Sequence, residues 1–225
     1  MSTFHSDRSF VAIIGDIRGS RSLTQRREIQ ENLGIILQEI NEGFEADIAA
    51  KFLITLGDEF QGLLFDGRSL LKIIEKIKIS LYPVTFRFGI GMGRITTDIY
   101  PEMALGADGP AFYRARSAIK LLKENESKKK AVLSDLSFRF EEKNSTTERL
   151  LNTAFTLLYS LEQTWTDRQR EIITDQLFHQ DGQKASALRL GITQSAVHKA
   201  LSAGSYYTYE KALKEVTSVM EEISI

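Results

Sequence analysis

The alternation of apolar and polar residues predicts strands and helices in a defined order. Short apolar runs at residues 10–14 and 52–56 are typical of buried strands, and residues 60–65 and 84–92 extend this pattern to four strands. Apolar residues spaced three and four apart predict amphipathic helices over residues 29–44 and 70–77. The resulting βαββαβ order is that of a ferredoxin-like sheet, so we expect an α+β fold.

After the fourth strand the pattern predicts one more helix and one more strand. Pro110 suits the first turn of a helix, where an N–H has no intrahelical partner. We interpret residues 123–130 as a solvated, charged loop and residues 131–133 as an edge strand. The remaining chain has a helical pattern throughout. We therefore predict a sheet domain over residues 1–142 and an all-helical domain over residues 143–225.

The helical part contains a possible helix-turn-helix. Residues 184–190 and 194–201 have the pattern of two short helices joined by a turn with Gly191, which is typical of this motif. Polar side chains on its second helix could contact bases or phosphates. The candidate DNA-binding residues are Arg189, Thr193, Gln194, Ser195, His198 and Lys199. Over the longer stretch of residues 166–201, five basic residues are set against four acidic ones, so a packing or dimerisation module is the alternative.

The composition excludes several kinds of chemistry. The formal net charge is -1, so no global basic field attracts nucleic acid. The chain has no cysteine, which excludes disulfides, thiolate zinc sites and a cysteine nucleophile. No apolar stretch approaches the roughly 20 residues of a membrane helix, and the first residues lack the apolar core of a signal peptide. We expect a cytoplasmic protein with no membrane partner.

Two Gly-Asp pairs carry the candidate chemistry. Asp16 follows the first strand, and Asp58 lies in the hairpin between the second and third strands. The expected topology brings both to one end of the sheet, although each alone is also typical of a turn. Paired carboxylates suit Mg²⁺, which completes its shell with phosphate oxygens and water. Glu59 is a possible third ligand, although strand alternation would point it to the face opposite Asp58.

Residues around this end of the sheet could hold the phosphates of a nucleotide. Arg18, Ser20 and Arg21 follow Asp16, and a guanidinium binds phosphate oxygens bidentately. An ordinary surface loop is an equally good interpretation. Asp108 precedes a helix whose positive end could attract an anion, or it is only the N-cap of that helix. We add Gly57 and Glu59 of the hairpin to these candidates.

These segments resemble known families. Residues 56–60 (Leu-Gly-Asp-Glu-Phe) resemble the GGDEF hairpin of diguanylate cyclases, and residues 10–17 resemble the first metal-binding strand of class III nucleotidyl cyclases. Residues 87–93 look like the glycine-rich fourth strand of those cyclases. The following helix looks like the one that carries their phosphate-contacting arginine. The resemblance implies that Asp16 and Asp58 hold metal and that Arg114 or Arg116 meets phosphate.

A more specific resemblance is to the bacterial SatD family. It rests on residues 15–21, 54–63, 106–111 and 115–116, and it extends from residue 10 to about residue 135. The string Leu-Gly-Asp-Glu-Phe-Gln-Gly-Leu at residues 56–63 makes it strong. The resemblance names a family without naming a reaction.

Three functions fit these observations. The first is a cytoplasmic regulator in which a Mg²⁺-dependent nucleotide site controls a DNA-binding helix-turn-helix. The second is an active nucleotidyl cyclase or polymerase-like enzyme acting on nucleoside triphosphates. Pro110 replaces the asparagine of the cyclase helix and Ile54 the purine-selecting lysine, so a divergent or degenerate cyclase is an open alternative. The third is a non-catalytic interaction protein, and the cyclase resemblance also implies a homodimer.

Overall fold

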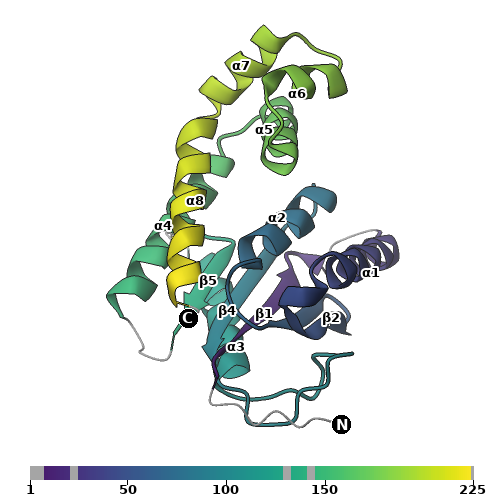
Figure 1. Ribbon diagram of the computed structural model, residues 1–225, viewed down its shortest axis with the longest axis vertical. Helices are drawn as coiled ribbons and strands as arrows, with labels where there is room; N and C mark the ends of the chain where they lie inside the picture. Colours follow the sequence, from purple (N-terminus) through teal and green to yellow (C-terminus); the bar gives the residue numbers. More distant parts are fainter. Residues whose placement is uncertain (1–7, 21–24, 129–132, 141–144, 224–225) are drawn as a thin grey trace.

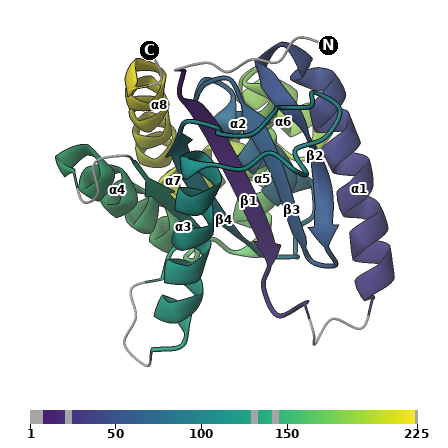
Figure 2. The ribbon, with the colours of Figure 1, turned by 90° about the horizontal axis from the view of Figure 1, so that it is seen from below.

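The centre of the protein is a five-stranded sheet. The computed structural model describes residues 8–20, 25–128, 133–140 and 145–223. The strands lie in the order β2-β3-β1-β4-β5 (Figures 1 and 2). The first four pair antiparallel, and β5 pairs parallel to β4. Their bounds are β1 Phe10–Ile17, β2 Ile48–Leu56, β3 Glu59–Leu64, β4 Phe86–Gly93 and β5 Leu136–Arg139. The predicted α+β class is therefore confirmed, and β1 and β3 are neighbours as expected.

Helices cover both faces of this sheet. Helices α1 (Arg26–Gly43) and α2 (Leu70–Ser80) lie on one face, and α3 (Pro110–Glu126) lies on the other (Figure 2). A single turn of 3₁₀ helix, η2 (Glu45–Asp47), leads into β2. Residues of β1 alternate between the two layers, with Val11 and Ile13 in one apolar cluster and Ala12 and Ile14 in the other. This double burial explains why the run at residues 10–14 is apolar throughout.

Alternate glycines in β4 let α3 approach the sheet closely. A Cβ added to Gly91 would lie 2.1 Å from the carbonyl oxygen of Ala111, and one added to Gly89 would lie 2.3 Å from that of Ala115. Any side chain at these positions would collide with the backbone of α3. On the helix side, Ala111, Ala115 and other small residues are fully buried. The glycine pattern of β4 thus serves helix packing.

The last strand differs from the prediction. Residues 131 and 132 lie outside the described residues, Leu133 and Ser134 are not in a strand, and β5 begins at Leu136. Leu136 pairs with Phe88 and Phe138 pairs with Ile90, and all four side chains are buried. The alternation of Leu136 and Phe138 was the correct signal, since a strand that adds to β4 must place every second residue in the core.

Five helices follow the sheet. They are α4 (Thr146–Glu162), α5 (Asp167–His179), α6 (Gln183–Arg189), α7 (Gln194–Ala203) and α8 (Tyr206–Ile223). Helices α5 to α7 lie farthest from the sheet, and α8 returns towards it beside α4 (Figure 1). A capping box between Thr166 and Gln169 begins α5.

One apolar cluster extends from the sheet into these helices. It contains Phe88 of β4, Phe155 of α4, Trp165, and Tyr209 of α8. The predicted domain boundary near residue 142 lies outside the described residues. In the described parts of the chain, no helix combines the length and the apolar character needed to cross a membrane.

Candidate functional site

The site is built on a row of charged residues at one end of the three strands β3, β1 and β4. Asp16 at the end of β1 pairs with Glu59 of β3 on one side and with Arg87 of β4 on the other. Directly opposed residues of antiparallel strands point to the same face, so these three side chains lie on the α3 side. Asp16 is 5% exposed. The sheet therefore holds a carboxylate with another carboxylate and a guanidinium as its immediate neighbours.

Two cations hold the carboxylate of Asp16. Arg87 donates to Oδ2, and Nζ of Lys123 donates to Oδ1 at 2.8 Å. A buried carboxylate needs such partners because desolvation of an unpaired charge is costly. The prediction that residues 123–130 form a solvated loop is wrong for Lys123. It lies in the last turns of α3, which continues to Glu126, and this places its ammonium over the sheet.

A chain of ion pairs leads from Asp16 to the C-terminal helices. Arg87 also donates to Oε2 of Glu126 at 2.6 Å, and Glu126 pairs with Arg18 at 3.1 Å. Arg18 donates to the hydroxyl of Tyr159 in α4 and to the carbonyl of Ser134, both at 2.7 Å. Arg18, a predicted phosphate ligand, thus ties the end of β1 to α4.

The hairpin between β2 and β3 lies at the same end of the sheet. Gly57 has a φ of 59°, a left-handed conformation that suits glycine in a tight turn. The backbone N–H of Ile17 donates to the carbonyl of Asp58 at 3.0 Å, so Asp16 and Asp58 share one end of the sheet as predicted. Ser20 donates to the carboxylate of Asp58. Arg21 lies outside the described residues.

Glu59 is the acidic group with a perturbed pKa at this end of the sheet. Burial raises the pKa of Glu59, and the nearby carboxylates of Asp16 and Asp58 raise it further, while Lys123 and Arg116 oppose them. The sequence placed Glu59 on the face opposite Asp58 and did not pair it with Asp16. The register of β1 and β3 supplies that relationship.

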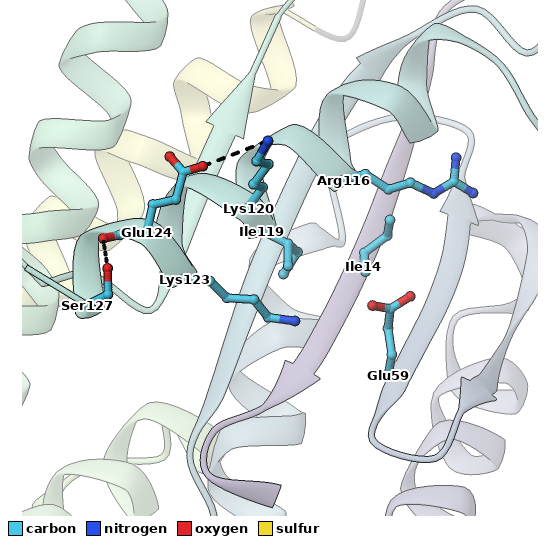
Figure 3. A pocket seen from close by; sticks show the side chains of 8 residues that line it. All are labelled: Ile14, Glu59, Arg116, Ile119, Lys120, Lys123, Glu124 and Ser127. Carbon is cyan, nitrogen blue, oxygen red and sulfur yellow. Dashed lines mark hydrogen bonds and ion pairs between the residues drawn. The ribbon is translucent and has the colours of Figure 1, made fainter.

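A pocket of about 460 Å³ lies between α3 and strands β1 and β3 (Figure 3). Ile14 and Ile119 form its apolar floor, and Glu59 reaches into it from β3. Its charged and polar rim on α3 consists of Arg116, Lys120, Lys123, Glu124 and Ser127. The sequence had identified only Arg116 and Glu59 among these residues. The three- and four-residue spacing of Arg116, Lys120 and Lys123 along one helix was the signal that could have revealed the two lysines.

The beginning of α3 differs from the expectation for Asp108. Gly109 occupies the N-cap position and makes no side-chain cap, so Asp108 is not the cap residue. The carboxylate of Asp108 accepts from the hydroxyl of Tyr113 at 2.8 Å and from Arg116 at 3.2 Å. Asp108 therefore positions Arg116 at the pocket. Arg114 donates to the carbonyl of Met92 at 2.5 Å and lies over Gly93 of β4.

The predicted Mg²⁺ ligands are two carboxylates with existing partners. Within the described ranges, no cluster of three or more acidic, histidine or cysteine side chains is arranged to hold a metal ion. The oxygen chemistry of Asp16 and Asp58 suits Mg²⁺. Both oxygens of Asp16, however, are bonded to cationic side chains. A metal ion at Asp16 would have to displace Lys123, the more exposed of the two cations.

The second group of predicted residues lies on α6 and α7. Gln194, Ser195, His198 and Lys199 are exposed along α7, and Thr193 caps this helix by accepting from the N–H of Ala196. Arg189 is instead bound by the carboxylates of Asp175 and Asp181. Hydrogen bonds from Arg189 lower the pKa of both aspartates. The charge of Arg189 is therefore already balanced within the protein.

Together these features define a mixed α+β protein with a cation-rimmed pocket on its sheet. The sequence profile of the SatD family matches residues 10–220, so the chain belongs to the SatD family, as its motifs indicated. No curated protein matches it. One similar solved structure is the catalytic core of a rhodopsin-guanylyl cyclase with converted specificity, in complex with ATPalphaS. Its sequence identity is 15% and its TM-score 0.35, over 49% of this chain and 71% of that chain. Neither fold nor activity follows from a similarity at that level.

Proposed function

We propose that the protein binds the phosphate groups of a nucleotide in the pocket on α3. The observation that carries this proposal is the spacing of Arg116, Lys120 and Lys123, which places three cations on one side of the helix. Glu59 and Glu124 are the acidic residues of the pocket lining, and Asp108 and Asp16 pair with Arg116 and Lys123 from outside it. Because burial raises the pKa of Glu59, its carboxyl also gives up negative charge more readily. The pocket is therefore suited to an anion.

Magnesium is the second part of the proposal. Asp16 and Asp58 would hold it at the edge of the pocket, and bound Mg²⁺ would supply positive charge to the phosphate oxygens. The ammonium of Lys123 would then leave Asp16 and bind a phosphate oxygen. The Lys123 side chain is long and 45% exposed, so it has room for this movement. Arg87 would stay on Asp16 and keep that carboxylate in place.

We favour a nucleotide sensor over a cyclase. Ile54 packs against the apolar core, and Pro110 is the first residue of α3. Neither side chain offers the hydrogen bonds that a cyclase uses at these positions. The path from Asp16 through Arg87, Glu126 and Arg18 to Tyr159 offers a physical connection from the pocket to α4. An effect of ligand on the C-terminal helices would use this connection.

The proposed output is DNA binding by a helix-turn-helix formed by α6 and α7. The supporting observation is the exposed polar face of α7, where Gln194, Ser195 and Lys199 are accessible to a duplex. The proposed protein is a cytoplasmic regulator that binds a nucleotide in the pocket on α3 and DNA through α7.

Thermal unfolding with a panel of ligands tests the nucleotide proposal. ATP, GTP and inorganic tripolyphosphate should each be added with and without Mg²⁺, since a ligand at one hundred times its Kd stabilises the native state by about 2.7 kcal/mol. Lys120→Ala should reduce this stabilisation, while Lys72→Ala on the opposite face of the sheet should not. If no member of the panel shifts the transition, the phosphate pocket is refuted. Analysis of nucleotide products in the same samples separates a sensor from an enzyme.

A further inference from the structure

A second charged cluster lies where the sheet meets the C-terminal helices. The ammonium of Lys78 on α2 pairs with Asp135 and Glu162, both at 2.8 Å, and with Glu75 at 3.5 Å. Glu162 belongs to α4, and Asp135 directly precedes β5. The hydroxyl of Tyr209 on α8 donates to Glu162 at 2.6 Å. Three segments thus meet at Lys78, and α8 joins them through Glu162.

The charges in this cluster do not balance. Three carboxylates surround a single ammonium, so full ionisation leaves an excess of negative charge in a largely buried place. Glu75 and Lys78 are each 20% exposed, and Asp135 and Glu162 are 12% and 7% exposed. An uncompensated buried charge is costly, and protonation of one carboxyl removes it.

The surrounding charged groups already have other partners. A cavity of about 250 Å³ between α2 and α5 is lined by Glu75, Glu162 and Trp165, and also by the charged groups Asp167, Arg170 and Glu171. Arg170 lies over the rings of Tyr82 and Trp165 and donates to the backbone carbonyl of Glu162. Tyr82 donates to Asp167, Arg168 binds Glu171, and Lys76 of α2 pairs with Glu39 of α1.

We propose that this cluster is a proton-binding junction. Glu75 takes up one proton from solution, and release of that proton loosens the packing of the C-terminal helices on α2. The proton bonds to a carboxylate oxygen of Glu75 and leaves one carboxylate fewer facing Lys78. This proposal is independent of the phosphate pocket, which lies on the other face of the sheet.

Glu75 changes its protonation state near neutral pH. Burial, together with the carboxylates of Glu162 and Asp135, raises the pKa of Glu75 to about 7 against the opposing effect of Lys78. An unfolded glutamate keeps a pKa of about 4.5. Between these values the folded protein binds more protons than the unfolded chain, so stability falls as the pH rises and levels off above about pH 7.

Trp165 reports on this junction, because it is the only tryptophan of the chain and lines the same cavity as Glu75. Its fluorescence should be titrated from pH 5 to 9 in the wild-type protein and in Glu75→Gln. We expect a single-proton transition near pH 7 in the wild type and its loss in Glu75→Gln. His179→Gln is the control, because it removes the imidazole carried by α5, a helix that lines the cavity, and it should leave the transition unchanged.

The result that would overturn the proposal is a transition that persists in Glu75→Gln or that disappears in His179→Gln. A wild-type signal without any transition would also overturn it. If Glu75→Gln does not fold, Asp135→Asn provides the second test. It removes a charge that raises the pKa of Glu75, so the midpoint should move to lower pH, and an unchanged midpoint contradicts the proposal.

Discussion

Lys123 donates to Asp16 across 107 residues of sequence at 2.8 Å. This contact joins the last turns of α3 to the end of the central strand β1 and places a partly exposed cation where a metal ion would otherwise approach. Arg87 holds the other oxygen of the same carboxylate. The two proposed ligands of the site, phosphate and Mg²⁺, therefore depend on Lys123 in opposite ways.

Lys123→Met should raise the affinity for Mg²⁺ and lower the affinity for tripolyphosphate. The substitution frees one oxygen of Asp16 and removes one cation from the pocket. An ion pair with an exposed partner contributes about 1 kcal/mol or less, which corresponds to a change of up to about fivefold in each Kd. Isothermal titration calorimetry measures both constants.

Lys120→Met is the matched control for this experiment. Lys120 lines the same pocket without contacting Asp16. It should weaken tripolyphosphate binding and leave Mg²⁺ affinity unchanged. Equal effects of the two substitutions on Mg²⁺ would show that Lys123 does not guard Asp16.

Gly91→Ala should destabilise the fold strongly. The added Cβ would lie 2.1 Å from the carbonyl oxygen of Ala111, so α3 would have to move away from β4. Overpacking of this kind typically costs about 1–3 kcal/mol, occasionally more. Urea unfolding measures the change. Gly34→Ala on α1 is the control, because its Cβ would meet nothing within 4 Å and alanine favours a helix by up to about 1 kcal/mol.

The sequence predicted the framework of the site because that framework depends on local pattern. Apolar runs and turn residues were enough to bring Asp16 and Asp58 to one end of the sheet. The same reasoning anticipated the hairpin turn at Gly57. These features are set by residues close to one another in the chain.

The partners of Asp16 could not be predicted in this way. Which residue faces Asp16 depends on strand register, and register assigned both Glu59 and Arg87 to it. Lys123 belongs to a run of charged residues, and such a run is typical of a solvated surface segment. Its role depends on how far α3 continues and how closely it packs on the glycines of β4. The contacts of Arg18 likewise depend on where α4 docks, which no short-range pattern specifies.

Lys78→Met should cost about 3 kcal/mol of stability at pH 8. Removing one partner from a buried ion pair typically costs about 3–5 kcal/mol, and the partial exposure of Lys78 favours the lower end. The loss should be smaller at pH 5, where protonation relieves the three remaining carboxylates. Lys76→Met on the same helix removes a more exposed pair with Glu39 and should cost about 1 kcal/mol or less at either pH. A loss for Lys78→Met that does not vary with pH would contradict the charge imbalance.

Lys199→Ala should weaken DNA binding and reduce the slope of log K against log salt by about one. The physical reason is the loss of one phosphate contact from the exposed face of α7. Lys211→Ala on α8 is the control and should preserve the slope. Arg189→Ala should mainly reduce stability, because it leaves Asp175 and Asp181 without their shared guanidinium. If Lys199→Ala leaves DNA affinity and its salt dependence unchanged, the DNA contact does not lie on this face of α7.

The most direct test of the phosphate pocket is calorimetric titration of tripolyphosphate into the wild type and into the double variant Arg116→Ala/Lys120→Ala. These residues line the pocket and lie outside the apolar core, so the variant should remain folded. We predict measurable binding by the wild type and at least a fivefold weaker affinity in the double variant. Circular dichroism should confirm that both proteins have the same secondary structure. Equal affinity of the two proteins, or no binding by the wild type, would contradict the assignment of this pocket to phosphate.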